Sequence, residues 1–291
     1  MITETARIAV IGGSGLYAMP ELEDIAHQTV ETPFGQPSAE IVVGTLRGKR
    51  VAFLPRHGLG HVYTPSTVPY RANITALKMM GVRFIIAVNA CGSLREDYAP
   101  GDIVIPDQLV DFTKADRGRT FFDTGIVGHV SAADPFSPEL NKVVAESVRR
   151  VGGTVHEGGT YITIEGPRFS TRGESHIFRQ WGCSIIGMTT SPEAFLAHEA
   201  EIAYTSMSHV TDYDVWHVSE APVTVEMVIE VMHRNLETAQ KAVADAVEHL
   251  DETLDLPAHH TLDHAIMTDR ARIPRETISR LRPIVGRLFA E

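Results

Sequence analysis

Short apolar runs recur along the chain and predict the strands of a β-sheet. Residues 84–88 form a continuous apolar run, which is typical of a strand that is buried on both faces. The runs 41–46 and 51–54 flank a polar turn that contains Gly48, and together they predict a hairpin. Further strands are predicted at residues 7–11, 103–105, 161–164 and 202–206.

Helical periodicity alternates with these runs. Residues 223–250 predict a long helix, because apolar residues recur on one face, namely Val225, Val228, Ile229, Met232, Leu236, Ala239 and Val243. At residues 192–200 a helix can begin with Ser191 as N-cap, Pro192 at the first position and Glu193 near the positive end of the dipole. Other helices are predicted at residues 67–81, 138–151, 172–181 and 273–288.

This alternation predicts an α/β fold with a central mixed, largely buried β-sheet flanked by helices. Predicted hairpins in the N-terminal third and at residues 101–113 argue against a purely parallel barrel. No repeat, linker or composition shift marks a boundary. We therefore expect a single domain over residues 1–291, with a C-terminal helical tail from about residue 252.

Composition and charge narrow the function classes. The formal net charge of −11 disfavours nucleic acid as a partner, because phosphate backbones need clustered Lys and Arg. No apolar run is long enough to span a bilayer, and the N-terminus lacks the features of a signal peptide. Cys91 and Cys183 show no disulfide or metal-site spacing. We expect a cytoplasmic protein with no membrane partner and no bound metal.

Two segments suit an anion. The loop at residues 12–16 is rich in glycine, which lets a backbone turn sharply and present N–H groups, and Ser14 adds a hydroxyl. Residues 13–18 also match a dinucleotide-binding pattern, but Pro20 interrupts the long helix that this pattern requires. Arg56 and His57 follow a predicted strand, and a guanidinium offers a planar fork to phosphate oxygens. Such a pair also occurs as ordinary surface charge.

Two further segments could approach a ligand. Residues 89–93 form a small, polar turn after the apolar strand, in which Cys91 is interpreted as a buried thiol and not as a nucleophile. In residues 163–170 a Gly-Pro turn projects Phe169 outward, where its ring could stack on a base or a sugar. Glu165 and Arg168 in the same segment could instead form a structural ion pair.

Hydroxyl and carboxylate groups occur after two later strands. Thr189 precedes a predicted helix N-terminus, so its hydroxyl could bind an anion or simply help to cap the helix. Asp212 and Asp214 are two residues apart and could converge on one ligand edge. An ionised carboxylate accepts from an exocyclic amine, and a protonated one donates to a ring nitrogen. Loops also use Asp to form turns.

Taken together, these segments resemble the 5′-methylthioadenosine phosphorylases, a branch of the trimeric purine nucleoside phosphorylases. The resemblance spans residues 8–250. It rests on GGSGLY at residues 12–17, TPFGQPS at 32–38, RHG at 56–58, NACGSLRED at 89–97, PGDIVIPDQ at 100–108, TIEGPRFSTRGES at 163–175, MTTSPEAFLAHEA at 188–200 and TDYDVW at 211–216.

The resemblance implies a role for each matching residue. Phosphate would contact Ser14, Arg56, His57, Asn89, Ala90 and Thr189. The nucleoside would contact Met188, Phe169, Ser170, Asp212, Tyr213, Asp214, Val225 and Val228, with the two valines forming an apolar slot for the 5′-methylthio group. Those valines could equally be ordinary core residues. His129 would reach into a neighbouring subunit of a trimer or of a dimer of trimers.

The implied reaction is the reversible phosphorolysis of S-methyl-5′-thioadenosine to adenine and 5-methylthio-α-D-ribose 1-phosphate, with inorganic phosphate as co-substrate and no cofactor. Asp214 is expected to be the acid that protonates N7 of the leaving base, because burial beside a second carboxylate raises a carboxyl pKa. Three alternatives stay open: phosphorolysis of 6-oxopurine nucleosides or methylthioinosine, hydrolysis by a nucleosidase, and nucleoside binding without catalysis.

The chain departs from the family pattern in three places. Ser14 and Asn89 stand where some members have Thr. The tail carries His259 and His260 and lacks the Cys-x-Cys of some long-tailed members, so no tail disulfide is expected.

Overall fold

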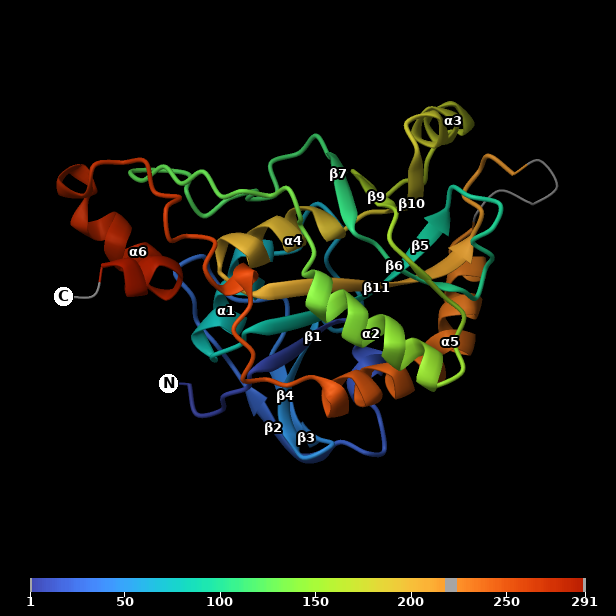
Figure 1. Ribbon diagram of the computed structural model, residues 1–291, viewed down its shortest axis with the longest axis horizontal. Helices are drawn as coiled ribbons and strands as arrows, with labels where there is room; N and C mark the ends of the chain where they lie inside the picture. The colour runs from blue at the N-terminus through green and yellow to red at the C-terminus, as the bar shows by residue number, and fades with distance from the viewer. Residues whose placement is uncertain (1, 218–223, 290–291) are drawn as a thin grey trace.

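The predicted mixed sheet is present in the computed structural model, which describes residues 2–217 and 224–289 (Figure 1). Within these residues the strand order is β2-β3-β4-β1-β5-β10-β9-β7, while β11 also pairs with β5 and β6, and β6 with β8. The strands are β1 (Ile8–Gly12), β2 (Glu23–Gln28), β3 (Ile41–Leu46), β4 (Lys49–Pro55), β5 (Phe84–Ser93), β6 (Ile103–Ile105), β7 (Gln108–Phe112), β8 (Val155–Glu157), β9 (Thr160–Ile164), β10 (Cys183–Gly187) and β11 (Ala203–Asp212).

Parallel strands form the centre of the sheet, and antiparallel strands form part of its outer region. β1 lies between β4 and β5 and is parallel to both, and β5 is also parallel to β11. β3 and β4 form the predicted hairpin. β10 meets β5 in the antiparallel direction, but only through Gly92 and Ser93 at the end of β5. This mixture confirms the predicted fold class.

Helices cover both faces of the sheet. They are α1 (Tyr70–Met79), α2 (Pro138–Arg150), α3 (Arg172–Gln180), α4 (Thr190–Glu199), α5 (Val225–His249) and α6 (Arg275–Val285), with short 3₁₀ helices η1 (Ser14–Tyr17), η2 (Pro257–His259), η3 (Arg270–Arg272) and η4 (Gly286–Leu288). Along β1 the side chains alternate. Ala9 and Ile11 join a core with residues of α1 and α4, while Ile8 and Val10 join a core with residues of α2 and α5. Burial on both faces explains the continuous apolar runs.

The C-terminal tail packs against the same body. Its residues Leu262, Ala265, Ile273, Leu281 and Ile284 belong to the hydrophobic core that contains α1 and α4. In Figure 1 α6 lies at the edge of the molecule beyond α1 and α4, and α3 projects from the opposite end. No described helix has the length and apolar character that a membrane crossing requires.

Two sequence predictions about strand ends were wrong. The turn predicted at residues 89–93 is the continuation of β5, because pairing with β11 extends as far as the Gly92–Asp212 register. The hairpin predicted at residues 101–113 is absent, since β6 pairs with β8 and β11 whereas β7 pairs with β9. Strands β2, β8 and β10 were not predicted.

Helix boundaries differ from the predictions by a few residues. α1 begins at Tyr70, three residues later than predicted. Ser191 has the extended backbone of an N-cap (φ −98°, ψ 134°), but its hydroxyl has no hydrogen-bond partner in the described region, so its side chain does not cap α4. The predicted start of the long helix at residue 223 lies outside the described residues.

Candidate functional site

A cavity of about 500 Å³ opens beside the C-terminal half of β5. Its position follows from the strand pairing. β1 pairs with β5 only up to Ala87, and β10 pairs with it only from Gly92, so the β5 edge between these residues has no neighbouring strand on that side. Ligand sites in α/β sheets gather beyond the carboxyl ends of parallel strands, where such gaps form.

The free edge of β5 presents backbone groups to the cavity. Arg56 Nη1 donates to the Val88 carbonyl at 3.1 Å, whereas the Cys91 carbonyl faces β11, where it lies 3.2 Å from Thr211 Oγ1. Because backbone groups alternate along a strand, Ala90 faces the same edge as Val88. Ala90 lines the cavity, so its N–H is available to an anion there.

Arg56 is buried and its guanidinium fork is already occupied. Nε and Nη2 donate to the two carboxylate oxygens of Glu193 at 2.7 and 2.8 Å, and Glu193 also accepts from the Tyr204 hydroxyl at 2.9 Å. Although burial lowers it, the Glu193 carboxylate raises the pKa of Arg56 above its usual value. The expected bidentate fork toward phosphate is therefore replaced by a pair with Glu193, and an anion can approach only the Nη1 side.

His57 lines the cavity beside Arg56 and is neutral. Burial and the Arg56 charge lower its pKa to about 4, although a bond to the Tyr63 carbonyl opposes them. That bond joins Nδ1 to the carbonyl oxygen at 2.8 Å, and a carbonyl only accepts, so Nδ1 carries the proton. Nε2 of the neutral ring is then an acceptor. His61, which also lines the cavity, stacks on His57 with ring centroids 4.1 Å apart.

Three more of the predicted phosphate and sugar contacts line the cavity, namely Asn89, Met188 and Thr189. Thr189 is buried and immediately precedes α4. The Asn89 side chain is held by hydrogen bonding, because its amide nitrogen donates to Ser206 Oγ at 2.7 Å. The side chain of Ser14 lies outside what the structure describes, and its backbone begins η1.

Asp212 and Asp214 lie together at the other end of the cavity, and their carboxyl groups differ. Asp212 Oδ1 accepts from the Asp214 N–H at 2.7 Å and Oδ2 accepts from the Thr211 hydroxyl at 2.6 Å. Asp214 Oδ2 is buried without a partner in the described region. Burial raises the pKa of Asp212 to about 6 and also raises the pKa of Asp214. Asp214 therefore presents a carboxyl oxygen to a ligand, and burial favours its protonated form, although the Ser175 and Ser170 hydroxyls oppose this effect.

The wall around this pair combines one aromatic ring with small groups. Phe169 and Ser170 line the cavity, and Ser170 Oγ is buried without a partner among the described residues. Gly92 lies beneath the two aspartates. A Cβ on Gly92 would stand 3.0 Å from Asp212 Oδ1 and from Ile186 Cγ2, and 3.3 Å from Asp214 Cβ, so an alanine would have to push these groups aside by a few tenths of an ångström.

Three of the predicted ligand contacts, Val225, Tyr213 and His129, do not line the cavity of this chain. Val225 at the start of α5 is 57% exposed, whereas the predicted contact Val228 does line the cavity, together with Ile229. The Tyr213 ring stacks on His217, with centroids 4.8 Å apart, outside the lining. His129 is exposed, and its N–H donates to the Ala265 carbonyl at 2.9 Å.

Several residues of the site were missed from the sequence. His209 on β11 is 1% exposed and lines the cavity, neither of its ring nitrogens has a described partner, and burial lowers its pKa to about 4. Asn235 on α5 also lines the cavity with an unpartnered amide nitrogen. Only the alternation along an unexpectedly long strand could have indicated His209. His61 and Glu193 had no sequence signal for their roles.

Two local interpretations have clear outcomes. Cys91 is a buried free thiol, and burial with the nearby Asp212 carboxylate raises its pKa well above the usual value, as expected of a non-nucleophilic cysteine. The ion pair between Glu165 and Arg168 does not form. Glu165 binds Arg117, and Arg168 pairs with Glu174 at 2.6 Å.

The arrangement defines a class of chemistry. One end of the cavity carries N–H donors, a hydroxyl and a buried arginine, which suit a small anion. The other carries a protonatable carboxyl, an aromatic ring and small groups, which suit a nitrogen heterocycle. These two kinds of lining are those that a nucleoside and a small anion would require.

Comparison with known proteins agrees with this class. The model of the phosphorylase superfamily matches residues 7–248, so the chain belongs to this superfamily. The chain is 52% identical to S-methyl-5′-thioadenosine phosphorylase of Chloroflexus aurantiacus over 286 residues, which cover 98% of this chain and 99% of the relative. It is 50% identical to the S-methyl-5′-thioadenosine phosphorylase of Geobacter sulfurreducens over 279 residues, covering 96% and 98%.

Solved structures agree as well. A methylthioadenosine phosphorylase from an antarctic soil metagenomic library superposes with a TM-score of 0.92 at 47% identity, covering 97% of this chain and 99% of that one. The methylthioadenosine phosphorylase of Schistosoma mansoni in complex with adenine gives a TM-score of 0.78 at 37% identity, covering 84% and 91%.

Proposed function

We propose that this protein is a pentosyltransferase that catalyses the reversible phosphorolysis of S-methyl-5′-thioadenosine to adenine and 5-methylthio-α-D-ribose 1-phosphate. Two relatives named S-methyl-5′-thioadenosine phosphorylase match 98% and 96% of the chain with 52% and 50% identical residues. The observation that carries the proposal is the cavity itself, with groups suited to an anion at one end and the buried Asp212 and Asp214 carboxyls at the other.

Phosphate binds at the β5 edge in this proposal. It contacts Ser14, the N–H of Ala90 beside Asn89, Nη1 of Arg56, and the Thr189 hydroxyl. His57 accepts a hydrogen bond from the P–OH group of hydrogenphosphate, because its Nδ1 proton is committed to Tyr63. Since Glu193 balances the Arg56 charge, directed donors contribute more to phosphate binding than net positive charge does.

The glycosidic bond then breaks, with phosphate acting on the sugar and Asp214 acting on the base. Positive charge develops on the ribosyl group, and phosphate stabilises this charge and attacks C1′. Adenine leaves as it takes a proton at N7 from Asp214, while Asp212 accepts from the N6 amine. Electrons from the C1′–N9 bond stay on the base as N7 takes the proton. The sugar phosphate releases the proton of hydrogenphosphate to solvent and Asp214 regains one from solvent, so atoms and charge balance without a covalent enzyme intermediate or a cofactor.

The remaining contacts complete the pocket. Met188 lies against the ribose, Phe169 and Ser170 border the adenine, and Val228 with Ile229 lines the 5′-methylthio end. Asp carboxyls favour adenine over 6-oxopurines, because a buried group that is left unpaired disfavours the wrong base. Methionine and purine salvage are the processes that such a reaction would serve.

We also propose a homotrimer, or a dimer of trimers, in which His129 completes a neighbouring site. Supporting features are the exposed apolar side chains beside it, Val127 at 48% and Met267 at 69%, which a partner subunit would cover. The proposed location is the cytoplasm, where the free cysteines stay reduced. Light scattering of the wild type and of His129→Ala, together with their turnover, tests the assembly.

The experiment that tests the substrate compares S-methyl-5′-thioadenosine, adenosine, inosine and methylthioinosine side by side in phosphate buffer, with base release followed by chromatography. We expect the highest kcat/KM with S-methyl-5′-thioadenosine and negligible release of hypoxanthine from inosine. A preference for inosine or methylthioinosine would contradict the assignment of the Asp pair. Saturable binding without release of any base would make the protein a nucleoside-binding protein.

A further inference from the structure

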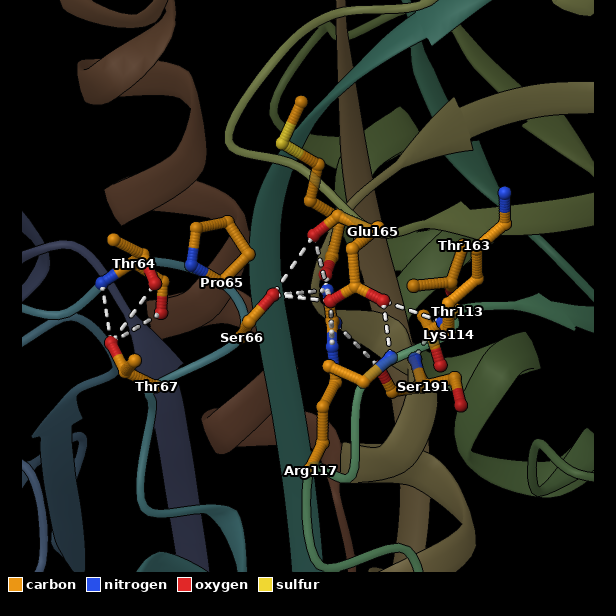
Figure 2. Close-up of polar contacts among 12 residues, drawn as sticks. Thr64, Pro65, Ser66, Thr67, Thr113, Lys114, Arg117, Thr163, Glu165 and Ser191 are labelled. Atoms are coloured by element: carbon orange, nitrogen blue, oxygen red, sulfur yellow. Dashed lines mark hydrogen bonds and ion pairs between the residues drawn. The ribbon is translucent and has the colours of Figure 1, made fainter.

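Arg117 is a buried arginine on the long loop between β7 and α2, and it does not line the cavity. Its side chain has 0% exposure, which is unusual for an arginine on a loop. Figure 2 shows its guanidinium at the meeting point of several segments. It donates from Nη1 to the Met188 carbonyl at 2.7 Å and to the Ser191 carbonyl at 3.3 Å, so it holds the backbone on both sides of Thr189.

The other edge of the guanidinium binds Glu165. Nε and Nη2 lie 3.2 and 3.0 Å from Glu165 Oε1, and Nη2 also donates to the Glu165 carbonyl. The second carboxylate oxygen accepts from the N–H groups of Lys114 and Ala115 at 2.5 and 2.7 Å. Although burial raises the pKa of Glu165, these bonds and that of Ser66 lower it to about 2, so the carboxylate is ionised at neutral pH.

Ser66 connects a third segment to the same group. Its hydroxyl lies 3.2 Å from Arg117 Nη2 and also donates to the Glu165 carboxylate (Figure 2). The residue before it, Pro65, lines the cavity. Arg117 therefore joins three stretches of the cavity wall, which are those around Pro65, around Phe169 beyond Glu165, and at Met188 with Thr189.

We propose that Arg117 is a positioning residue, which fixes Met188 and Thr189 against the Glu165 and Ser66 segments so that sugar and phosphate are held in line. The inference rests on the proposed function, because it assigns the consequence of the network to phosphate and nucleoside binding. A displacement of about 1 Å in such contacts can lower a rate by about 100-fold. Only a guanidinium supplies donors in several fixed directions, and a lysine ammonium cannot serve both carbonyls and the carboxylate.

The test compares Arg117→Met and Arg117→Lys with a control outside the cavity, Arg287→Met, whose side chain is 43% exposed. Arg287 also makes an ion pair with a buried glutamate, Glu201, but neither residue lines the cavity. Melting temperature, kcat, and the KM values for phosphate and nucleoside are measured for each. We expect both KM values to rise and kcat/KM to fall by about 100-fold in Arg117→Met, with a partial loss in Arg117→Lys. Arg287→Met should lose stability but keep its kinetic constants.

Chemical rescue separates positioning from folding. In Arg117→Ala, added guanidinium chloride at concentrations below those that unfold the wild type should restore kcat/KM by about tenfold, while ammonium chloride at equal ionic strength should not. If the Arg117 variants do not fold, Ser66→Ala replaces them in the test, because it keeps the arginine and removes only one of its contacts. This variant should raise the KM for phosphate. Kinetic constants like those of Arg287→Met, with no rescue and an unchanged Ser66→Ala enzyme, would overturn the proposal.

Failure of the proposed function would look different. In that case the wild type itself would release no adenine. Calorimetric titration of the wild type and of Arg117→Met with inorganic phosphate and with adenine would then test whether Arg117 positions the binding groups, independently of turnover. Weaker binding of phosphate in the variant supports positioning, and equal binding overturns it.

Discussion

Replacing Asp214 with Asn isolates the proton transfer that the proposed mechanism assigns to this carboxyl. The substitution keeps the side-chain volume. The Ser175 and Ser170 hydroxyls and the Val215 N–H, which lower the pKa of Asp214, can still donate to the amide oxygen of an asparagine. The backbone N–H of residue 214 can still donate to Asp212 Oδ1. The folded state should therefore lose less than about 1 kcal/mol.

The catalytic loss should be far larger than the loss of stability. A positioned general acid contributes about 10²–10⁴-fold, so kcat should fall by that factor, equivalent to about 3–5.5 kcal/mol of transition-state stabilisation. Burial raises the pKa of Asp214, which keeps its proton available at higher pH than for an exposed Asp. In the wild type kcat should fall as the pH rises above this pKa, and Asp214→Asn should lose that alkaline limb.

Asp212→Asn is the matched comparison. Both oxygens of Asp212 are engaged by Thr211 and by the residue 214 N–H, so this residue should act mainly in holding the base. We expect a higher KM for S-methyl-5′-thioadenosine and a retained pH limb. Steady-state kinetics between pH 5 and 9, with melting curves for each variant, give the answer. Near-normal kcat in Asp214→Asn, with the limb lost only in Asp212→Asn, would refute the assignment of the acid.

Three further predictions follow from single contacts. Gly92→Ala places a methyl 3.0 Å from Asp212 Oδ1, so kcat/KM should fall by about tenfold or more while the fold persists, and unchanged kinetics would show that the aspartates tolerate displacement. Sulfate lacks a proton to donate to His57 Nε2, so it should inhibit about tenfold less tightly than phosphate binds, and equal affinity would contradict the Nδ1–H tautomer. Burial raises the pKa of Glu199 from 4.5 to about 7 against hydrogen bonds from Phe121 N–H and the Thr120 hydroxyl. Its contribution to stability is full below pH 4.5 and is lost as pH rises through about 7, a change of at most about 3 kcal/mol that Glu199→Gln should abolish in urea titrations.

The sequence predicted those elements whose pattern is local. β1, β4 and β5 are apolar on both faces, and α2 and α5 carry continuous apolar faces. The pattern of apolar residues along the sequence was therefore enough to predict these elements. β2 was missed because its side chains EDIAHQ are mostly exposed and its strand conformation depends on pairing with β3. The β5 extension through Gly92 was missed because polar and small residues resemble a turn until β11 pairs with them.

The residues of the candidate site likewise fall into those with a local sequence signal and those without one. Arg56, His57, Thr189 and Asp212 were candidates because each follows a predicted strand or precedes a predicted helix. The Arg56 partner Glu193 lies 137 positions away, and no local pattern specifies that pairing. Arg117 occupies a loop without periodicity, so its role depends on contacts 48 and 71 positions distant. Tertiary contacts of this range have no signature in one sequence.

The most direct test of the central claim is a product measurement with S-methyl-5′-thioadenosine in the presence and absence of inorganic phosphate. Adenine is quantified by chromatography and the sugar product by phosphorus NMR. We predict adenine release only with phosphate, together with an equal amount of 5-methylthioribose 1-phosphate, and formation of nucleoside when both products are supplied. Equal adenine release without phosphate, with free 5-methylthioribose as the sugar product, would contradict the claim and identify a hydrolase.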